Sequence, residues 1–155
     1  MRDEHGAAFG WRSLFTVFGL QAVLAWLVAS PLLAASIAMP ARPFWPLLLA
    51  SGLLLASAGL LTEAVADAQM ARFRACRPPP GGVLDRGLWR YSRHPNYFGE
   101  CCVWWGLGLM ALACGWAAAW SLVSPLLMTV LLLRVSGVRL LEQDIADRRP
   151  AYRDY

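Results

Sequence analysis

Apolar positions along the chain gather into four runs that polar segments separate. The first covers about residues 14–38, the second 47–61 and the third 96–120, while the fourth starts near Ser121 and ends at Arg134. About 20 apolar residues in a helix cross a hydrocarbon core of ~30 Å. We therefore expect an all-α, polytopic membrane protein of about four transmembrane helices, forming a single membrane domain over residues 1–155. Pro31 lies inside the first run and predicts a kink there.

The second run continues without a helix breaker into the segment TEAVADAQMARFRA. Glu63, Asp67, Met70 and Arg74 follow one another at spacings of four, three and four, which places them on one helical face. The segment RPPPGGVLDRG then predicts a loop. One long helix thus carries a polar stripe out of the membrane. The stripe is either a solvated extension with pairs at i,i+4 or one wall of a site.

Composition and charge strengthen the membrane interpretation. Hydrophobic residues make up 58% of the chain and charged residues 15%, against about a quarter in soluble domains. All 14 basic residues are arginine: two precede the first run, six lie between Arg72 and Arg93, five start at Arg134, and Arg42 alone lies between the first two runs. The positive-inside rule then places both termini and the loop before the third run in the cytoplasm. Four cysteines without a CxxC pair indicate neither a disulfide framework nor a metal site.

The stretch GLWRYSRHPNYFGECCVWWG, residues 87–106, combines ionisable side chains with the start of the third run. Asn96, Glu100 and Trp104 share a helical face, with Tyr97 beside them. An acid at a membrane boundary is costly without a partner or a function. One interpretation pairs Glu100 with an arginine inside an aromatic belt. The other is a pocket for a charged, partly planar ligand, in which Asn96 binds an amide and three basic residues bind phosphate: Arg90, Arg93 and His94.

A third polar cluster follows the fourth run. Arg134, Val138 and Glu142 share one face, although snorkelling to the headgroups also accounts for Arg134. The terminal RRPAYRDY is expected to be a surface tail. Three helices therefore bring polar groups to one face of the membrane, which favours a shared ligand site.

Several of these segments resemble a known family. They are LWRYSRHPNYFGE followed by WWG, the preceding EAVADAQMARF, and LLLRVSGVRLLE with RRPAYRDY. Together they resemble the bacterial membrane proteins of the DUF1295 family, relatives of the steroid 5-alpha-reductases, over essentially the whole chain. The Arg-His-Pro, Tyr and Gly-Glu pattern is also similar, more distantly, to isoprenylcysteine carboxyl methyltransferases.

The reductase resemblance implies a helical enzyme that uses NADPH to reduce a carbon–carbon double bond conjugated to a carbonyl in a lipid or steroid-like molecule. It implies cofactor binding by seven residues: Asp67, Arg74, Arg93, His94, Asn96, Tyr97 and Glu100. Arg93 and His94 match only the bacterial and methyltransferase-like version. Glu63 stands where steroid reductases have asparagine, and Gly82 where a basic residue often contacts the cofactor.

The chain also resembles only the cofactor-binding, C-terminal half of such a fold and looks truncated at both ends. The substrate half is then expected from elsewhere, so the catalytic residues stay unassigned. Two alternatives remain: an S-adenosylmethionine-dependent methyltransferase acting on a lipid or lipidated thiol, and a non-catalytic membrane module. We expect an integral protein of a bacterial inner membrane, with its site facing the cytoplasm, membrane lipids around it, and neither a metal nor a nucleic acid as partner.

Overall fold

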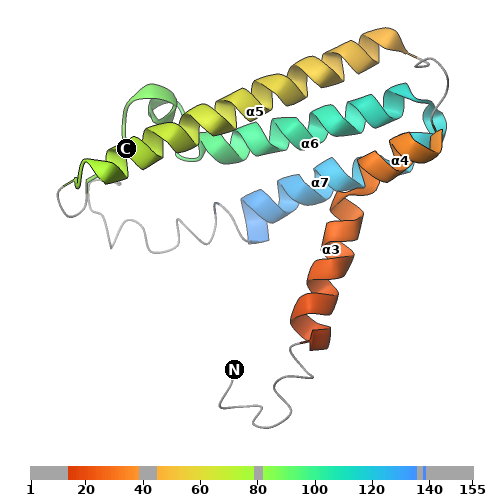
Figure 1. Cartoon of the computed structure of the whole chain (residues 1–155), viewed down its shortest axis with the longest axis horizontal. Coiled ribbons are helices and arrows are strands. Elements are labelled where there is room, and N and C mark those ends of the chain that lie inside the picture. Colours follow the sequence, from red (N-terminus) through yellow and green to blue (C-terminus); the bar gives the residue numbers. More distant parts are fainter. Residues whose placement is uncertain (1–13, 39–44, 79–81, 136–137, 139–155) are drawn as a thin grey trace.

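The computed structural model describes residues 14–38, 45–78, 82–135 and 138, and these residues form helices and connections without a strand (Figure 1). The all-α expectation is confirmed. In chain order the helices are η2 (Leu14–Gly19), α3 (Leu20–Val28), α4 (Ser30–Ala38), α5 (Pro46–Ala75), η3 (Gly87–Arg90), α6 (Pro95–Ala113), η4 (Trp116–Leu122), α7 (Val123–Val130) and η5 (Leu131–Val135).

Helices α4, α5, α6 and α7 lie side by side, whereas α3 projects away from them (Figure 1). The first apolar run bends by 45° between Val28 and Ser30. Pro31 is the second residue of α4, where its missing N–H removes no intrahelical hydrogen bond. The predicted kink is therefore present, and the helix resumes at once after it.

Among the described residues, two helices are long and apolar enough to cross a membrane: Pro46–Ala75 and the continuous stretch Trp116–Val135. The bent pair Phe15–Val28 and Ser30–Ala38 makes a third if it counts as one span. The chain is thus a polytopic helical membrane protein. Helix α6 carries the polar motif in its first turns and does not meet that apolar criterion, so four crossings remain a prediction.

The boundary between the third and fourth runs was predicted wrongly. We expected a third helix up to Trp120 and an N-cap at Ser121, but α6 ends at Ala113 and the chain turns at Gly115, whose φ is +140°. Only glycine adopts that backbone conformation readily. Ser121 instead lies within η4, where its hydroxyl donates to the Ala118 carbonyl oxygen at 2.8 Å. Residues 107–120 are almost uniformly apolar, so the sequence pattern did not indicate the turn.

Helices α5 and α6 run antiparallel along a seam of glycines. A β-carbon placed on Gly59 would lie 2.6 Å from the Gly99 carbonyl oxygen, and one on Gly106 would lie 2.6 Å from the Gly52 carbonyl oxygen. Small residues let membrane helices approach backbone to backbone. The seam therefore fixes the level at which the first turn of α6 meets α5.

Side-chain hydrogen bonds connect the other helices to one another and to this pair. Ser124 of α7 donates to the Val28 carbonyl oxygen at 2.6 Å, and Ser30 of α4 donates to the Ser121 carbonyl oxygen at 3.3 Å. The Trp105 indole N–H of α6 donates to the Thr129 hydroxyl of α7 at 3.2 Å. Such bonds connect helices where apolar packing alone gives little preference over lipid.

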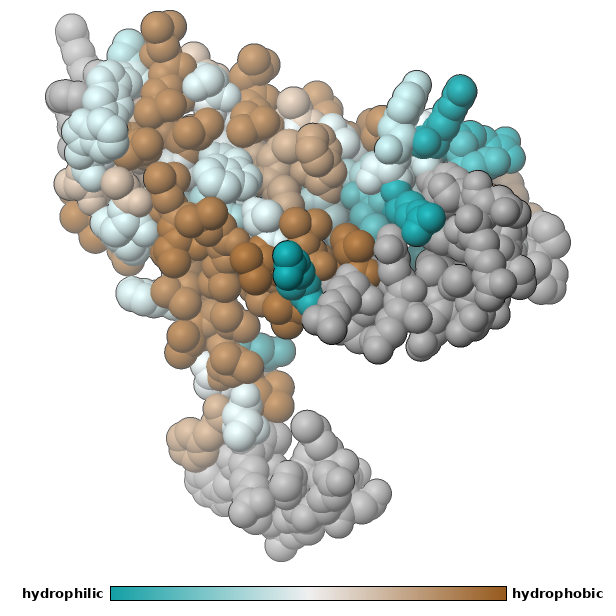
Figure 2. All heavy atoms as spheres, turned by 180° about the vertical axis from the view of Figure 1, so that it is seen from behind, coloured by the Kyte–Doolittle hydropathy of each residue, from teal (hydrophilic) through white to brown (hydrophobic). Residues whose placement is uncertain are grey.

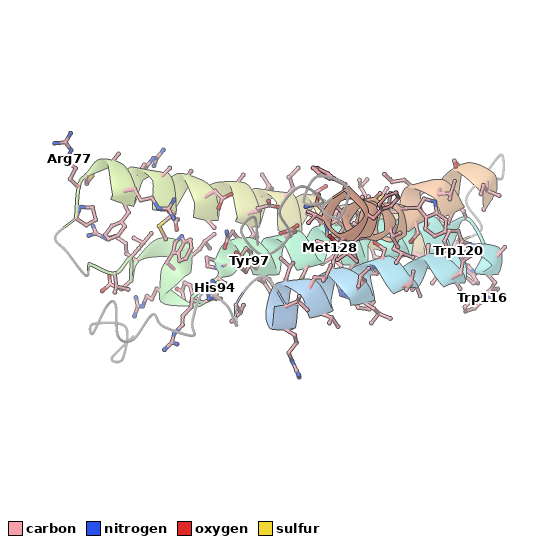
Figure 3. The ribbon with its side chains drawn as sticks, turned by 90° about the horizontal axis from the view of Figure 1, so that it is seen from below. Arg77, His94, Tyr97, Trp116, Trp120 and Met128 are labelled. Carbon is pink, nitrogen blue, oxygen red and sulfur yellow. The ribbon has the colours of Figure 1, made fainter. Side chains whose placement is uncertain are left out.

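The two ends of the bundle differ in chemistry. Trp45 and Trp116 meet edge to face at 4.9 Å between ring centroids, and Trp116 and Trp120 are exposed at this end (Figure 3). Hydrophobic side chains cover the middle of the face seen in Figure 2, while hydrophilic ones gather toward the end that carries the C-terminus of α5. Tryptophans are typical of a membrane–water boundary. The polar motif therefore lies at the end opposite a tryptophan boundary.

Candidate functional site

The site begins where α6 starts against α5. A β-carbon on Gly99 would lie 2.8 Å from the backbone nitrogen of Glu63 and 3.1 Å from its β-carbon. Glu63 lies about 27 Å along α5 from Trp45, at roughly 1.5 Å per residue. This distance is close to the ~30 Å thickness of a hydrocarbon core. The polar groups around Glu63 and Gly99 thus lie near the second membrane boundary rather than at its centre.

The loop before α6 is fixed to α5 by two side chains. Trp89 of η3 is buried, and its indole N–H donates to the Ala66 carbonyl oxygen at 3.0 Å. The Gln69 Oε1 atom accepts from the backbone N–H of Leu88 at 2.9 Å. Gly87 has a φ of +65° and a β-carbon there would lie 2.5 Å from Gln69 Oε1. These contacts hold the segment that carries the basic motif.

His94 and Tyr97 form a stacked pair at the start of α6, with ring centroids 5.4 Å apart and an interplanar angle of 10° (Figure 3). Pro95 is the first residue of α6 and His94 its N-cap, with the His94 backbone N–H donating to the Ser92 hydroxyl at 3.2 Å. The rings are half-buried. The motif therefore presents a flat aromatic surface beside the first turn of the helix.

The Asn96 side chain has an unsatisfied acceptor. Its Oδ1 atom is buried and has no hydrogen-bond partner among the described residues. Buried polar atoms of side chains are nearly always hydrogen-bonded in native proteins, and each exception needs an explanation. A donor from a bound molecule would satisfy this oxygen.

Glu100 lies half-buried one turn beyond Asn96. The groups that act on its carboxyl are Glu63, Asp67 and the hydrogen-bonded side chain of Trp104, and no arginine of the described residues is among them. The predicted shared face of Glu100 and Trp104 is therefore present. The alternative in which Glu100 is paired with an arginine has no support in the described part of the chain.

Two carboxylates of α5, Glu63 and Asp67, lie within electrostatic range of Glu100 of α6. Glu63 is half-buried and Asp67 exposed. Arg74, on the same face as Asp67, is exposed in the last turn of α5, about 10 Å farther along the axis. The predicted stripe thus divides into a carboxylate cluster against α6 and an arginine beyond it.

The remaining predicted groups are less closely placed. Arg93 is half-buried in the turn before α6 and Arg90 is exposed at the end of η3. Arg134 is exposed in η5, whereas Glu142 and the RRPAYRDY tail lie outside the described residues. Within the described residues no group of three or more His, Cys, Asp or Glu side chains is arranged to hold a metal ion.

Sequence reasoning missed Gln69 and Trp89. Gln69 of α5 and Trp89 of η3 fix η3 to α5, and neither belongs to the polar stripe. A helical period extended from Ala66 through Gln69 and Phe73 would have indicated a second face of α5, because these three positions are spaced by three and four. Ala66 on that face forms a buried core with Leu84 and Trp89, which come from the loop and from η3.

The comparison with protein families agrees with the resemblance in the sequence. The model of DUF1295, described as a protein of unknown function, matches residues 1–155, which is the entire chain. No curated protein and no solved structure matches the chain.

Proposed function

This chain belongs to the DUF1295 family, and we propose that it is a membrane oxidoreductase that reduces a carbon–carbon double bond conjugated to a carbonyl, using NADPH. The observation that carries the proposal is the buried Asn96 Oδ1 atom, which lacks a donor among the described residues. A nicotinamide carboxamide offers such a donor. The similarity of the Asn-aromatic-x-Gly-Glu sequence, residues 96–100, to the steroid 5-alpha-reductases supports this choice of ligand.

The residues present fit a nicotinamide nucleotide in three ways. Asn96 would accept a hydrogen bond from the carboxamide, and the Glu100 and Asp67 carboxylates would accept from ribose hydroxyls. The stacked His94 and Tyr97 rings offer a flat surface to a planar ring. Guanidinium groups bind phosphate by charge-assisted hydrogen bonds, and two of them would come from Arg93, in the turn before α6, and Arg74, about 10 Å along α5 from Asp67.

The protein's contribution is binding and orientation. When bound, NADPH supplies a hydride for the β-carbon of the conjugated double bond. The first turn of α6, held against α5 by Gly99 and Gly59, keeps Asn96 and Glu100 at fixed positions relative to Glu63. The location of these groups near a membrane boundary suits a lipid or steroid-like substrate that enters from the bilayer. Groups that polarise the substrate carbonyl are not assigned to this chain.

The proposal includes the side of the membrane. Six arginines between Arg72 and Arg93 accompany the site, and cytoplasmic segments carry such an excess. We place the site on the cytoplasmic face of a bacterial inner membrane, where NADPH is available to it.

One observation favours a second candidate. Glu63 and Asp67 lie within electrostatic range of Glu100, so this region carries several acidic groups. S-adenosylmethionine carries a sulfonium and an amino group, and carboxylates attract both. A methyltransferase acting on a lipid or a lipidated thiol would use the same end of α6. The reductase remains our proposal because an unsatisfied amide oxygen, three residues after Arg93 in the chain, suits an amide-bearing, phosphorylated ligand more closely.

The test is thermal stabilisation of the purified protein in detergent by NADPH, NADH and S-adenosylmethionine. A ligand at 100 times its dissociation constant adds about 2.7 kcal/mol to the stability of the folded state. NADPH is expected to raise the melting temperature and S-adenosylmethionine to leave it unchanged. Stabilisation by S-adenosylmethionine alone would overturn the reductase proposal in favour of the methyltransferase. Absence of any response would overturn both and leave a non-catalytic module.

A further inference from the structure

A cavity lies on the other side of α5 from Arg74. It has a volume of about 420 Å³, and its lining is almost entirely apolar. The last turn of α5 provides Phe73, its C-cap is Cys76, and the loop before η3 provides Leu84. This volume falls within the range of about 300–1,000 Å³ for sites that take small organic molecules.

The cavity is separate from the proposed cofactor site. Arg72 lines it and Arg74 does not. Residues two apart on an α-helix point about 200° away from each other around the axis. Phe73 also packs on the buried core of Ala66, Leu84 and Trp89. The floor is therefore rigid, and a ligand here would not compete for Asn96 or Glu100.

Two arginines flank this apolar cavity, Arg72 from α5 and Arg86 from the loop. Both side chains are exposed, and neither guanidinium has a hydrogen bond or ion pair with any described residue. Paired guanidinium groups above apolar walls are complementary to a molecule with an anionic head and a hydrocarbon body.

The position of the cavity relative to the bilayer indicates whether that molecule is a membrane lipid or a solute. Gln69 and Cys76 lie about 35 and 45 Å along α5 from Pro46, at the rise of an α-helix. On the scale that puts Glu63 near the second hydrocarbon boundary, Gln69 lies about 9 Å farther out, so the cavity starts in the headgroup layer of that leaflet, which adds about 5–8 Å to a ~30 Å core, and extends toward water. We propose that the cavity binds an anionic phospholipid, with its phosphate between Arg72 and Arg86 and its upper acyl part against Phe73, Pro78 and Leu84.

Cys76 gives a direct measurement because it is exposed and lines the cavity. The protein is alkylated with a maleimide in detergent, with short-chain phosphatidylglycerol, short-chain phosphatidylcholine or glycerol phosphate added, and labelling is followed by peptide mass spectrometry. At ten times its dissociation constant, phosphatidylglycerol is expected to slow Cys76 labelling about tenfold. The rate at Cys114, at the opposite end of α6, should not change.

The test protein is the double variant Arg72→Gln, Arg86→Gln. The matched control is the double variant Arg77→Gln, Arg134→Gln. Both remove two exposed positive charges, and Arg77 points away from the bundle (Figure 3). The first pair should lose the protection by phosphatidylglycerol and the control should keep it. The proposed site is wrong if phosphatidylcholine protects Cys76 from labelling as well as phosphatidylglycerol does. It is also wrong if both double variants lose the protection equally. Equal protection by glycerol phosphate shows a site for free phosphate and overturns the assignment to a lipid. None of these outcomes bears on the separate proposal that the protein binds NADPH.

Discussion

The indole N–H of Trp89 donates a hydrogen bond of 3.0 Å to the carbonyl oxygen of Ala66, so η3 is fixed to α5 at the level of the site. The Trp89 ring is also buried, with 6% of its surface exposed. Trp89 thus supplies packing and one of the two polar attachments of the loop that carries the basic motif.

Trp89→Phe should therefore destabilise the protein by about 1–3 kcal/mol, because the Ala66 carbonyl loses a partner and the smaller ring leaves a void. The measurement is the melting temperature in detergent, together with NADPH affinity, which should fall as Arg93 and His94 lose their fixed position. Trp116→Phe at the exposed end serves as the control. Equal losses in both variants would show that the Trp89 contact has no special role.

Replacing a glycine of the α5–α6 seam should separate the two helices. In Gly59→Ala the new methyl group would lie 2.6 Å from the Gly99 carbonyl oxygen, and the backbone has no room to yield. We expect a loss of roughly 1–3 kcal/mol, as for other overpacked cores, and weaker nucleotide binding.

Gly108→Ala is the matched control for the seam. Its β-carbon would lie 3.2 Å from side-chain atoms of Leu122 and Pro125 and would meet no backbone. Alanine also favours a helix over glycine by about 1 kcal/mol. Gly108→Ala should thus be nearly neutral when assayed by thermal unfolding. A Gly59→Ala protein as stable as Gly108→Ala would contradict the close backbone approach.

Asn96→Ala should separate ligand binding from stability. The Oδ1 atom has no partner among the described residues, so its removal costs little in the free protein or even stabilises it, because a buried unsatisfied acceptor is unfavourable. The stabilisation by NADPH should disappear, since the ligand then lacks its acceptor. Thermal melts with and without NADPH measure both effects.

Glu100→Gln tests the same pocket from the next turn of α6. It should abolish the nucleotide response while membrane insertion, followed by fractionation, stays intact. If NADPH still stabilises both the Asn96 and the Glu100 variants, the site lies elsewhere.

Salt should weaken the binding of NADPH, because the attraction between phosphates and arginines at the surface is screened within about 10 Å at 0.1 M ionic strength. Arg74→Gln should lower the affinity and flatten this salt dependence, since Arg74 is exposed on the face of Asp67. Isothermal titration over a range of salt concentrations measures both. Arg77→Gln, whose side chain points away from the bundle, should behave like the original protein.

Sequence periodicity was sufficient for the all-α fold and for which residues share a face of one helix. The apolar runs indicated a membrane protein, the kink at Pro31 followed from the ring of proline, and the spacing of Asn96, Glu100 and Trp104 placed them together. The family was also identifiable from short motifs. Each of these conclusions depends on interactions along one helix or on the residues themselves.

Only the tertiary structure showed which segment packs against each face of those helices. The glycine seam sets α6 against α5 so that Glu100 meets Glu63 and Asp67 instead of an arginine, and Gly115 ends α6 where uniform apolarity concealed a turn. Trp89 and Gln69 became visible as supports of the site only once η3 was placed on α5. A sequence records the period of each helix, whereas the partner of a face depends on backbone approach between segments that are distant along the chain.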